Sequence, residues 1–433
     1  MRTGRAVEGA IQRLQPYGRG GRIREAVGLL LVAEGLVASV GEVGLLHLPW
    51  GEVPAEVVGF RGEDALLMPL GEVKGVQRGA LVEALQQPLK VGVGPGMVGR
   101  VVGPLGEPLD GGPLWEVAEE RVLEGEAPAA LERAPIRERL LTGVRAIDHL
   151  LTLGKGQRVG IFAGSGVGKS TLLGMIARRN QAPVTVVALI GERGREVREF
   201  LEEDLGEEGR PKSVVVVATS DQPALLRIKA AHTATAIAEY FRDQGQDVVL
   251  MMDSLTRFAM ALREVGLAAG EPPTTRGYTP SVFAALPRLV ERAGPAGKGS
   301  ITAFYTVLVE GDDFQEPVAD AVRGLLDGHI VLSRRLAQEH HYPAIDILES
   351  LSRLMPKVVG EEELRWAGEA RRILATYRDA QDLIHIGAYQ PGRDPEIDRA
   401  VALRPRLMAF LRQGIHEPPG TETLAQVLGE GRP

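Results

Sequence analysis

The sequence contains no cysteine in its 433 residues. This absence excludes disulfide bonds, thiolate metal sites and cysteine nucleophiles, and the cytoplasm is the simplest location for such a chain. Histidine offers no metal chemistry either, because no His-x-x-x-His spacing occurs and His340 and His341 are only adjacent. We therefore expect these two histidines to have a structural role.

Long apolar runs and an excess of positive charge are also missing. No stretch approaches the ~20 apolar residues of a membrane span, and the N-terminus has no signal-peptide core, so we expect a soluble chain. Lys and Arg total 50 against 57 Asp and Glu, which gives a net charge of −7. That balance argues against a surface that coats nucleic acid, and we expect no nucleic-acid partner.

The chain does have 44% apolar residues, enough for several hydrophobic cores and hence several domains. Residues 1–20 place Val7, Ile11 and Leu14 at helical spacing among arginines, before glycines end the pattern. This predicts a basic amphipathic arm. Two interpretations stay open: a frayed surface helix, or an arm that docks on a partner or an anionic membrane.

Residues 21–92 consist of short β-rich runs separated by glycine turns, which is typical of a small antiparallel barrel. The runs cover residues 27–32, 44–48, 55–59, 65–69 and 80–84. A connection rich in glycine and proline follows up to residue 112 and marks a domain boundary.

Residues 93–356 alternate apolar β-rich runs with helical segments, the clearest helix being 224–244. The apolar runs cover residues 158–163, 184–190, 214–218, 248–252, 301–307 and 329–332. They are continuously apolar, as expected for strands buried on both faces of a mostly parallel sheet in a doubly wound α/β core. After Pro356 the strand signals stop, and residues 357–433 predict a small helical domain with helices over 362–383 and 395–413.

The run Ala163-Gly164-Ser165-Gly166-Val167-Gly168-Lys169-Ser170 fits the P-loop pattern, with Ala in place of the usual first Gly. It lies between an expected strand and an expected helix, where glycines turn backbone N–H groups toward phosphate and the helix N-terminus favours anions. We expect Lys169 to bridge the β- and γ-phosphates and the Ser170 hydroxyl to bind Mg²⁺. The predicted nucleotide-binding residues are Gly164, Ser165, Gly166, Val167, Gly168, Lys169, Ser170 and Thr171.

Two carboxylates follow other expected strands. Asp253 ends the run 248–252, where a Mg²⁺-holding Walker B carboxylate belongs, although an Asp after a strand also caps helices. Glu192 follows the run 184–190 and could orient the attacking water, with Arg193 holding phosphate or Glu192. From the pattern alone, a solvated charge cluster stays an alternative for residues 192–196.

Together these motifs resemble the catalytic subunits of rotary ATPases and, more closely, the type III secretion and flagellar protein export ATPases. The resemblance spans residues 27–413. It rests on residues 163–171, Gly-Glu-Arg-Gly-Arg-Glu at 191–196, Asp-Ser-Leu-Thr-Arg-Phe at 253–258, residues 272–281, Glu-Gly-Asp-Asp at 310–313, Tyr-Pro-Ala-Ile-Asp at 342–346 and Ser-Leu-Ser-Arg at 350–353.

The resemblance implies a multidomain α/β fold with an N-terminal β-barrel, a central RecA-like P-loop ATPase domain and a C-terminal helical domain. It implies that Glu192 is the catalytic carboxylate, that Arg193 is a phosphate or Glu partner and that Tyr342 is an aromatic wall against adenine. Arg353 matches an arginine finger that enters the neighbouring subunit's site in a homohexamer. Two loops, 271–281 and 310–317, resemble those that face the ring bore.

The leading hypothesis is a homohexameric Mg-ATPase, with ATP and Mg²⁺ in its site, that energises protein export, most simply flagellar export. Its implied partners are stator and central-stalk proteins, chaperone–cargo complexes and an export gate, which would hold it peripherally at the inner membrane. An injectisome ATPase is the sister alternative. Among ATP synthase subunits, the non-catalytic one is disfavoured by Glu192, because it carries Gln there, and the catalytic one by residues 272–281. An RNA-translocating ring is disfavoured because no basic, aromatic face is evident in the N-terminal domain.

Overall fold

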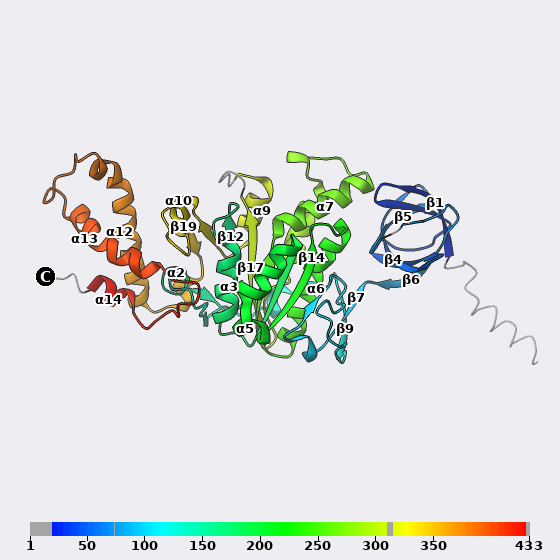
Figure 1. Ribbon diagram of the computed structural model, residues 1–433, viewed down its shortest axis with the longest axis horizontal. Helices are drawn as coiled ribbons and strands as arrows, with labels where there is room; N and C mark the ends of the chain where they lie inside the picture. Colours follow the sequence, from blue (N-terminus) through cyan, green and yellow to red (C-terminus); the bar gives the residue numbers. More distant parts are fainter. Residues whose placement is uncertain (1–19, 73, 310–314, 430–433) are drawn as a thin grey trace, which may run out of the picture.

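The computed structural model describes residues 20–72, 74–309 and 315–429 (Figure 1). The expected arm therefore lies outside the described residues, apart from Gly20, and so does the start of the expected loop 310–317. Three bodies follow one another along the molecule: a barrel at one end, a domain built on a large sheet, and a group of helices at the other end (Figure 1). Across the described residues, no helix is both long and apolar enough to cross a bilayer.

The N-terminal body is a closed barrel with strand order β1-β2-β5-β4-β3-β6. Its strands are β1 (Gly20–Val27), β2 (Leu30–Glu34), β3 (Glu42–Leu48), β4 (Gly51–Arg61), β5 (Asp64–Pro69) and β6 (Leu81–Pro88). Four expected runs fall on β3 to β6, but the single strand expected over 27–32 is wrong. β1 ends at Val27 and β2 begins at Leu30, because Gly28 has a φ of 59° and turns the chain into a hairpin.

The central body is a nine-stranded sheet in which β19-β18-β12-β17-β15-β13-β14-β8 are neighbours and β16 pairs with β17. All pairs from β18 to β8 are parallel, whereas β19 is antiparallel to β18. The strands are β8 (Val101–Val102), β12 (Arg158–Ala163), β13 (Val184–Glu192), β14 (Ser213–Thr219), β15 (Asp247–Asp253), β16 (Gly294–Ala296), β17 (Gly299–Leu308), β18 (Gly328–Leu332) and β19 (Ile345–Ser352). This arrangement confirms the expected α/β fold class.

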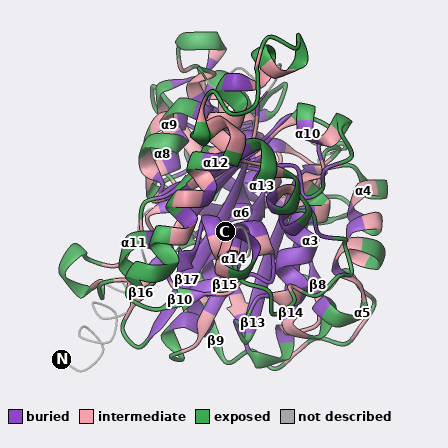
Figure 2. Ribbon diagram, turned by 90° about the vertical axis from the view of Figure 1, so that its left-hand side faces the viewer, coloured by how far each residue is buried: buried purple, intermediate pink, exposed green. Residues whose placement is uncertain are grey.

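Helices cover both faces of this sheet, as the alternation along β13 shows. Val186 and Ala188 pack in the core that contains α6, whereas Val187 and Leu189 pack in the core that contains α3. Figure 2 shows the strands buried between these layers. The helices are α2 (Arg145–Leu150), α3 (Lys169–Arg179), α4 (Gly194–Glu199), a π-helix η3 (Phe200–Leu205), α5 (Gly206–Gly209), α6 (Ala224–Asp243), α7 (Leu255–Ala269), α8 (Pro280–Val290), α9 (Pro317–Leu325) and α10 (Arg334–Gln338).

The C-terminal body is helical. It comprises α11 (Met355–Val358), α12 (Glu361–His385), α13 (Pro395–Leu411) and α14 (Leu424–Gly429). Ala370 of α12 and Leu407 of α13 share the core that lies beneath α3, so these helices pack as a continuation of the central domain. The expected boundaries at residues 92 and 356 fall inside short elements, β7 (Lys90–Val93) and α11, and β7 pairs with β9 (Glu119–Val122).

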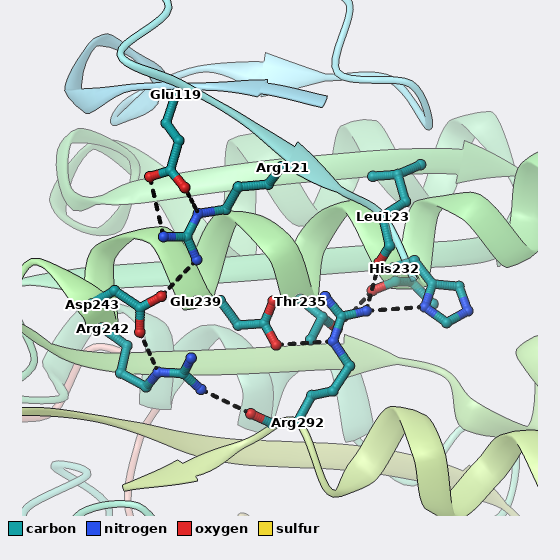
Figure 3. A network of polar contacts seen from close by, with 10 residues as sticks. Glu119, Arg121, Leu123, His232, Thr235, Glu239, Arg242, Asp243 and Arg292 are labelled. Atoms are coloured by element: carbon teal, nitrogen blue, oxygen red, sulfur yellow. Dashed lines mark hydrogen bonds and ion pairs between the residues drawn. The ribbon is translucent and has the colours of Figure 1, made fainter. Parts of the chain in front are cut away.

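Buried charges join the segment after the barrel to helix α6 (Figure 3). The Arg292 guanidinium is 1% exposed; it donates to both carboxylate oxygens of Glu239 and to the Leu123 carbonyl. Arg121 spans Glu119 and Asp243 in the same network. Each buried cation is matched by a carboxylate, which is what makes its burial tolerable.

Lys229 of α6 extends this pattern to the barrel itself. Its Nζ lies 2.5 Å from Glu56 Oε2 on β4 and 2.6 Å from Glu124 Oε1, and its side chain is 3% exposed. Burial raises the pKa of Glu56, and the Lys229 charge opposes that rise only in part. Lys229 is therefore the cation that partners Glu56 at the junction of two domains.

Replacing Lys229 with Met is expected to lower the unfolding free energy by about 3–5 kcal/mol at pH 8, because a buried carboxylate loses its counter-ion. The pKa of Glu56 is already raised, so in the variant this group takes up a proton as the pH falls and the deficit shrinks by pH 5. Denaturant unfolding at both pH values measures the difference. A Lys229→Met/Glu56→Gln double variant should recover part of the loss, and an equal deficit at both pH values would contradict this account.

Candidate nucleotide site

The P-loop connects β12 to α3 at the carboxyl edge of the parallel sheet. Gly166 and Gly168 have φ values of 77° and 91°, a left-handed conformation that other residues rarely adopt, and Gly168 is the N-cap of α3. The loop borders a cleft of about 700 Å³. Among the predicted nucleotide-binding residues, those lining it are Gly164, Ser165, Gly166, Gly168, Lys169, Ser170 and Thr171. Val167 does not: its side chain is 2% exposed and packs in the core beneath the loop.

Three predicted side chains converge on this cleft. Lys169 Nζ lies 2.5 Å from Asp253 Oδ1, at the end of β15, and 3.6 Å from Glu192 Oε1, at the end of β13. They meet because parallel strands β12, β13 and β15 all end at the same edge. Burial pulls the pKa of Lys169 down, but the charges of Asp253 and Glu192 outweigh it and the net shift is upward.

A hydrogen bond from the neighbouring strand holds the Asp253 side chain in place. Asp253 is 2% exposed, and its Oδ1 accepts a hydrogen bond of 2.8 Å from Thr306 Oγ1 on the neighbouring strand β17. Its helix-capping alternative does not describe the structure, because the Ser254 side chain caps α7 by accepting from the Arg257 amide. The Asp253 carboxylate is thus left to face Lys169 and the cleft.

Glu192 has a strongly raised pKa. Burial, together with the nearby charge of Asp253, raises its pKa to about 7, although Lys169 opposes the shift. The protonated Glu192 also hydrogen-bonds the Glu196 carboxylate of α4, which raises the pKa of Glu192 further. A carboxyl group that changes charge near neutrality suits a group that accepts a proton from water. In the sequence, Glu196 is marked only as the last residue of the motif 191–196, and the motif alone does not assign it a role beside Glu192.

Arg193 lines the same cleft, and its ion pair within the described residues is with Glu196 and not with Glu192. Its side chain is 76% exposed and lies 3.6 Å from Glu196 Oε1, within the first turn of α4. Of the two roles predicted for Arg193, the exposed position favours a contact with phosphate rather than with Glu192.

Tyr342 lies beside the P-loop, on the side of the C-terminal helices. A Cβ placed on Gly168 would lie 3.6 Å from the Tyr342 ring, so the ring lies close beside the P-loop at this glycine. Tyr342 also lines a second hollow, of about 760 Å³, together with Phe410, Gln413 and Arg145. Gln413 closes this hollow, since its amide donates to the Tyr342 carbonyl and its Nε2 to the Gly143 carbonyl. Sequence patterns gave no signal for Phe410 or Gln413.

Two further cations line the cleft without having been predicted. Arg257 follows β15 and packs against Gly191, where a Cβ would lie 3.2 Å from its side chain. Arg334 lies just beyond β18, the strand next to β12. Arg257 stands in the motif 253–258 and could have been singled out there, but nothing in the sequence marks Arg334.

Arg353 is not part of this cleft. It follows β19, which is antiparallel to its neighbour: Ile345 pairs with Leu332 at the P-loop edge, and Ser352 pairs with Gly328 at the opposite edge. The four steps from Leu332 to Gly328 are roughly 13 Å of strand, and the exposed Arg353 lies beyond them. Arg353 therefore lies at the far edge of the sheet, away from its own P-loop.

Comparisons with known proteins agree with this architecture. The nucleotide-binding domain of the ATP synthase alpha/beta family matches residues 143–352, the beta-barrel domain of that family matches residues 23–86, and the T3SS EscN ATPase C-terminal domain matches residues 359–430. These matches confirm the expected succession of a barrel, a nucleotide-binding ATPase domain and a C-terminal helical domain.

Whole-chain relatives give the same result. The flagellum-specific ATP synthase of Bacillus subtilis is 55% identical, with 94% of each chain covered. The type 3 secretion system ATPase of Xanthomonas euvesicatoria is 51% identical over 95% of this chain and 93% of that one. The assembled ATPase EscN of the enteropathogenic E. coli type III secretion system superposes with a TM-score of 0.90, at 48% identity over 95% and 99% of the two chains. The chain is thus an ATPase, and it belongs to the flagellum-specific and type III secretion ATPases of the ATP synthase alpha/beta family.

Proposed function

We propose that this ATPase energises protein export through a flagellar type III apparatus, as a homohexameric ring whose sites are each completed by Arg353 of the neighbouring subunit. The observation that carries the proposal is the reversal at β19, which places Arg353 at the sheet edge opposite its own P-loop. An arginine that stabilises transition-state charge would have to come from another copy. Several relatives are flagellum-specific, and the EscN relative has been captured assembled and with its central stalk EscO.

Within the cleft, the P-loop amides and Lys169 would hold the ATP phosphates. Lys169 then exchanges its bond to Asp253 for phosphate oxygens, which frees the Asp253 carboxylate. Ser170 and Asp253 fit a Mg²⁺ site, since this ion favours one or two protein oxygens beside phosphate and water, and when bound it would neutralise charge on the β- and γ-phosphates. Glu192 would orient the attacking water and accept its proton, while Arg193 contacts phosphate.

The proposed cellular role includes a stator, a central stalk, chaperone–cargo complexes and an export gate, with the ring held peripherally at the inner membrane. An injectisome role is the second candidate, because type 3 secretion system ATPases also match at 51–52% identity. Motility separates the two: the gene should restore swimming to a bacterium whose flagellar ATPase is deleted. Restoration of injectisome secretion but not of swimming would reverse the choice.

Assembly is tested by measuring ATP turnover against protein concentration. We expect turnover per subunit to rise as rings form, and to be indifferent to added RNA. Full turnover in a dilute monomer would contradict a site shared between subunits, and stimulation by RNA would favour an RNA-translocating ring.

Turnover should also depend on pH through Glu192. This group must be ionised to accept a proton from water, and its pKa is about 7. Turnover at pH 6 is therefore expected to be about tenfold below its plateau above pH 8. Glu196→Gln removes the hydrogen-bonded neighbour that raises this pKa, so its profile should be displaced to lower pH. A rate that is flat from pH 6 to 8 would remove Glu192 from the proton-accepting role.

A further inference from the structure

The proposed ring, on which the following argument rests, requires the surface around Arg353 to meet the rim of a neighbour's nucleotide cleft. That rim includes α4 and the start of the π-helix η3, because Glu199 and Phe200 line the cleft with the P-loop. Figure 2 shows α4 and α5 at one side of the central domain and α11, which begins two residues after Arg353, at the other. Opposite sides of one subunit are what a head-to-tail ring brings together.

One stretch on the cleft side is strongly acidic. Residues 199–208 contain six carboxylates and no Lys or Arg. Two of these carboxylates are each paired with the arginine four residues earlier, Glu199 with Arg195 and Glu202 with Arg198. Glu203, Glu207 and Glu208 are exposed and form no ion pair within the described part of the chain. We call residues 199–208 the acidic face.

The opposite side carries positive charge that is not neutralised within the chain. Arg137 and Lys357 line one hollow of about 680 Å³, together with Leu354, the residue after Arg353. Arg137, Arg353 and Lys357 are all exposed, and none of the three is ion-paired with any residue that the structure describes. We call Arg137, Arg353 and Lys357 the basic face.

We propose that the acidic face of one subunit docks on the basic face of the next, so that this charge pairing steers Arg353 into the neighbour's cleft. The occupant of each face is a second copy of this chain. Exposed charges of opposite sign attract over about 10 Å at moderate ionic strength, which favours the register in which the arginine and the cleft meet. If two subunits met through the same face, like charges would be opposed. The charge pairing therefore also disfavours that orientation.

Charge reversal of each face tests the proposal. Glu203→Lys/Glu207→Lys reverses the acidic face, and Arg137→Glu/Lys357→Glu reverses the basic face. Each variant presents like charges to itself, so we expect the concentration for half-maximal assembly and turnover to rise about tenfold or more. Asp379→Lys/Asp382→Lys on α12 makes a matched change of charge outside both faces and should assemble as the unmodified chain does.

Mixing the two reversed variants gives the sharper result. Each reversed face then meets a complementary one on the other variant, so an alternating ring should form and turnover should return at the concentration of the unmodified chain. Salt provides a second reading: it should weaken assembly of the unmodified chain and strengthen assembly of either reversed variant alone. Sedimentation velocity and turnover are measured together on folded proteins, as verified by their melting temperatures.

The outcomes separate this proposal from the shared-site function. If the reversed variants assemble like the unmodified chain, or if the mixture does not recover, the charge pairing is overturned while a shared site can still stand. If the unmodified chain is fully active as a monomer, the shared site itself fails.

Discussion

Replacement of Arg353 by Ala is expected to lower ATP turnover in the assembled ring by about 10³-fold or more, with little change in ATP affinity. The reason is geometric. No P-loop can be served by the Arg353 of its own chain, because β19 runs back to the opposite edge of the sheet. The loss should appear in kcat and not in nucleotide binding, because an arginine in this role stabilises charge that develops in the transition state.

Mixing two inactive variants tests whether Arg353 acts in the nucleotide site of the neighbouring subunit. Lys169→Ala and Arg353→Ala subunits are each expected to be inactive alone. In a random mixture, about a quarter of interfaces join an intact P-loop to an intact Arg353, so activity should reappear. An exposed arginine elsewhere, as in Arg378→Ala, serves as the matched control and should leave turnover near that of the unmodified chain. If the mixture has no ATP turnover, or if Arg353→Ala alone is fully active, the shared site is contradicted.

The second large effect is expected for Glu192→Gln. This change keeps the size of the side chain but removes the proton acceptor, and general-base catalysis of this kind is worth about 10²–10⁴-fold. Nucleotide binding should persist or strengthen, because a negative charge beside the phosphates is removed while Lys169 and Asp253 remain. Single-turnover hydrolysis and binding of a fluorescent nucleotide measure the two properties separately.

Two outcomes would reassign the role of Glu192. Retention of more than about a tenth of the turnover would move the proton-accepting role to Glu196, its hydrogen-bonded neighbour. Loss of nucleotide binding together with turnover would indicate a structural role. Glu362→Gln, on α12 outside the cleft and both faces and ion-paired with Arg365, is the control and should retain nearly full activity.

The convergence of the catalytic groups could be predicted from the sequence because it follows from local signals. Asp253 directly follows an apolar run, Glu192 follows another after one glycine, and Lys169 lies in the P-loop that follows a third. Parallel strands bring the ends of all three runs to one edge of the sheet. The chain reversal at Gly28 was missed for a related reason. An apolar run of six residues looks continuous, whereas one glycine with positive φ divides it into two strands.

Other features depend on contacts that no local pattern encodes. Gln413 reaches Gly143 across 270 residues of sequence, so the hollow beside Tyr342 appears only once α13 has packed on the central domain. The antiparallel direction of β19 is likewise a property of the completed sheet, and only this direction separates Arg353 from its own P-loop. Arg334 becomes part of the cleft because β18 pairs with β12, a pairing across roughly 170 residues of sequence.

The antiparallel strand β19 has one more consequence. It begins three residues after Tyr342, which lies beside the P-loop of its own subunit, and ends one residue before Arg353, which would serve the next subunit. If the mixing experiment places Arg353 in the neighbour's cleft, a single short segment would have one end on each of two consecutive nucleotides. Closure of a subunit around its own ATP would then shift the Arg353 that it contributes to the neighbouring site. The order of hydrolysis around the ring would follow from this one strand, without a separate coupling element.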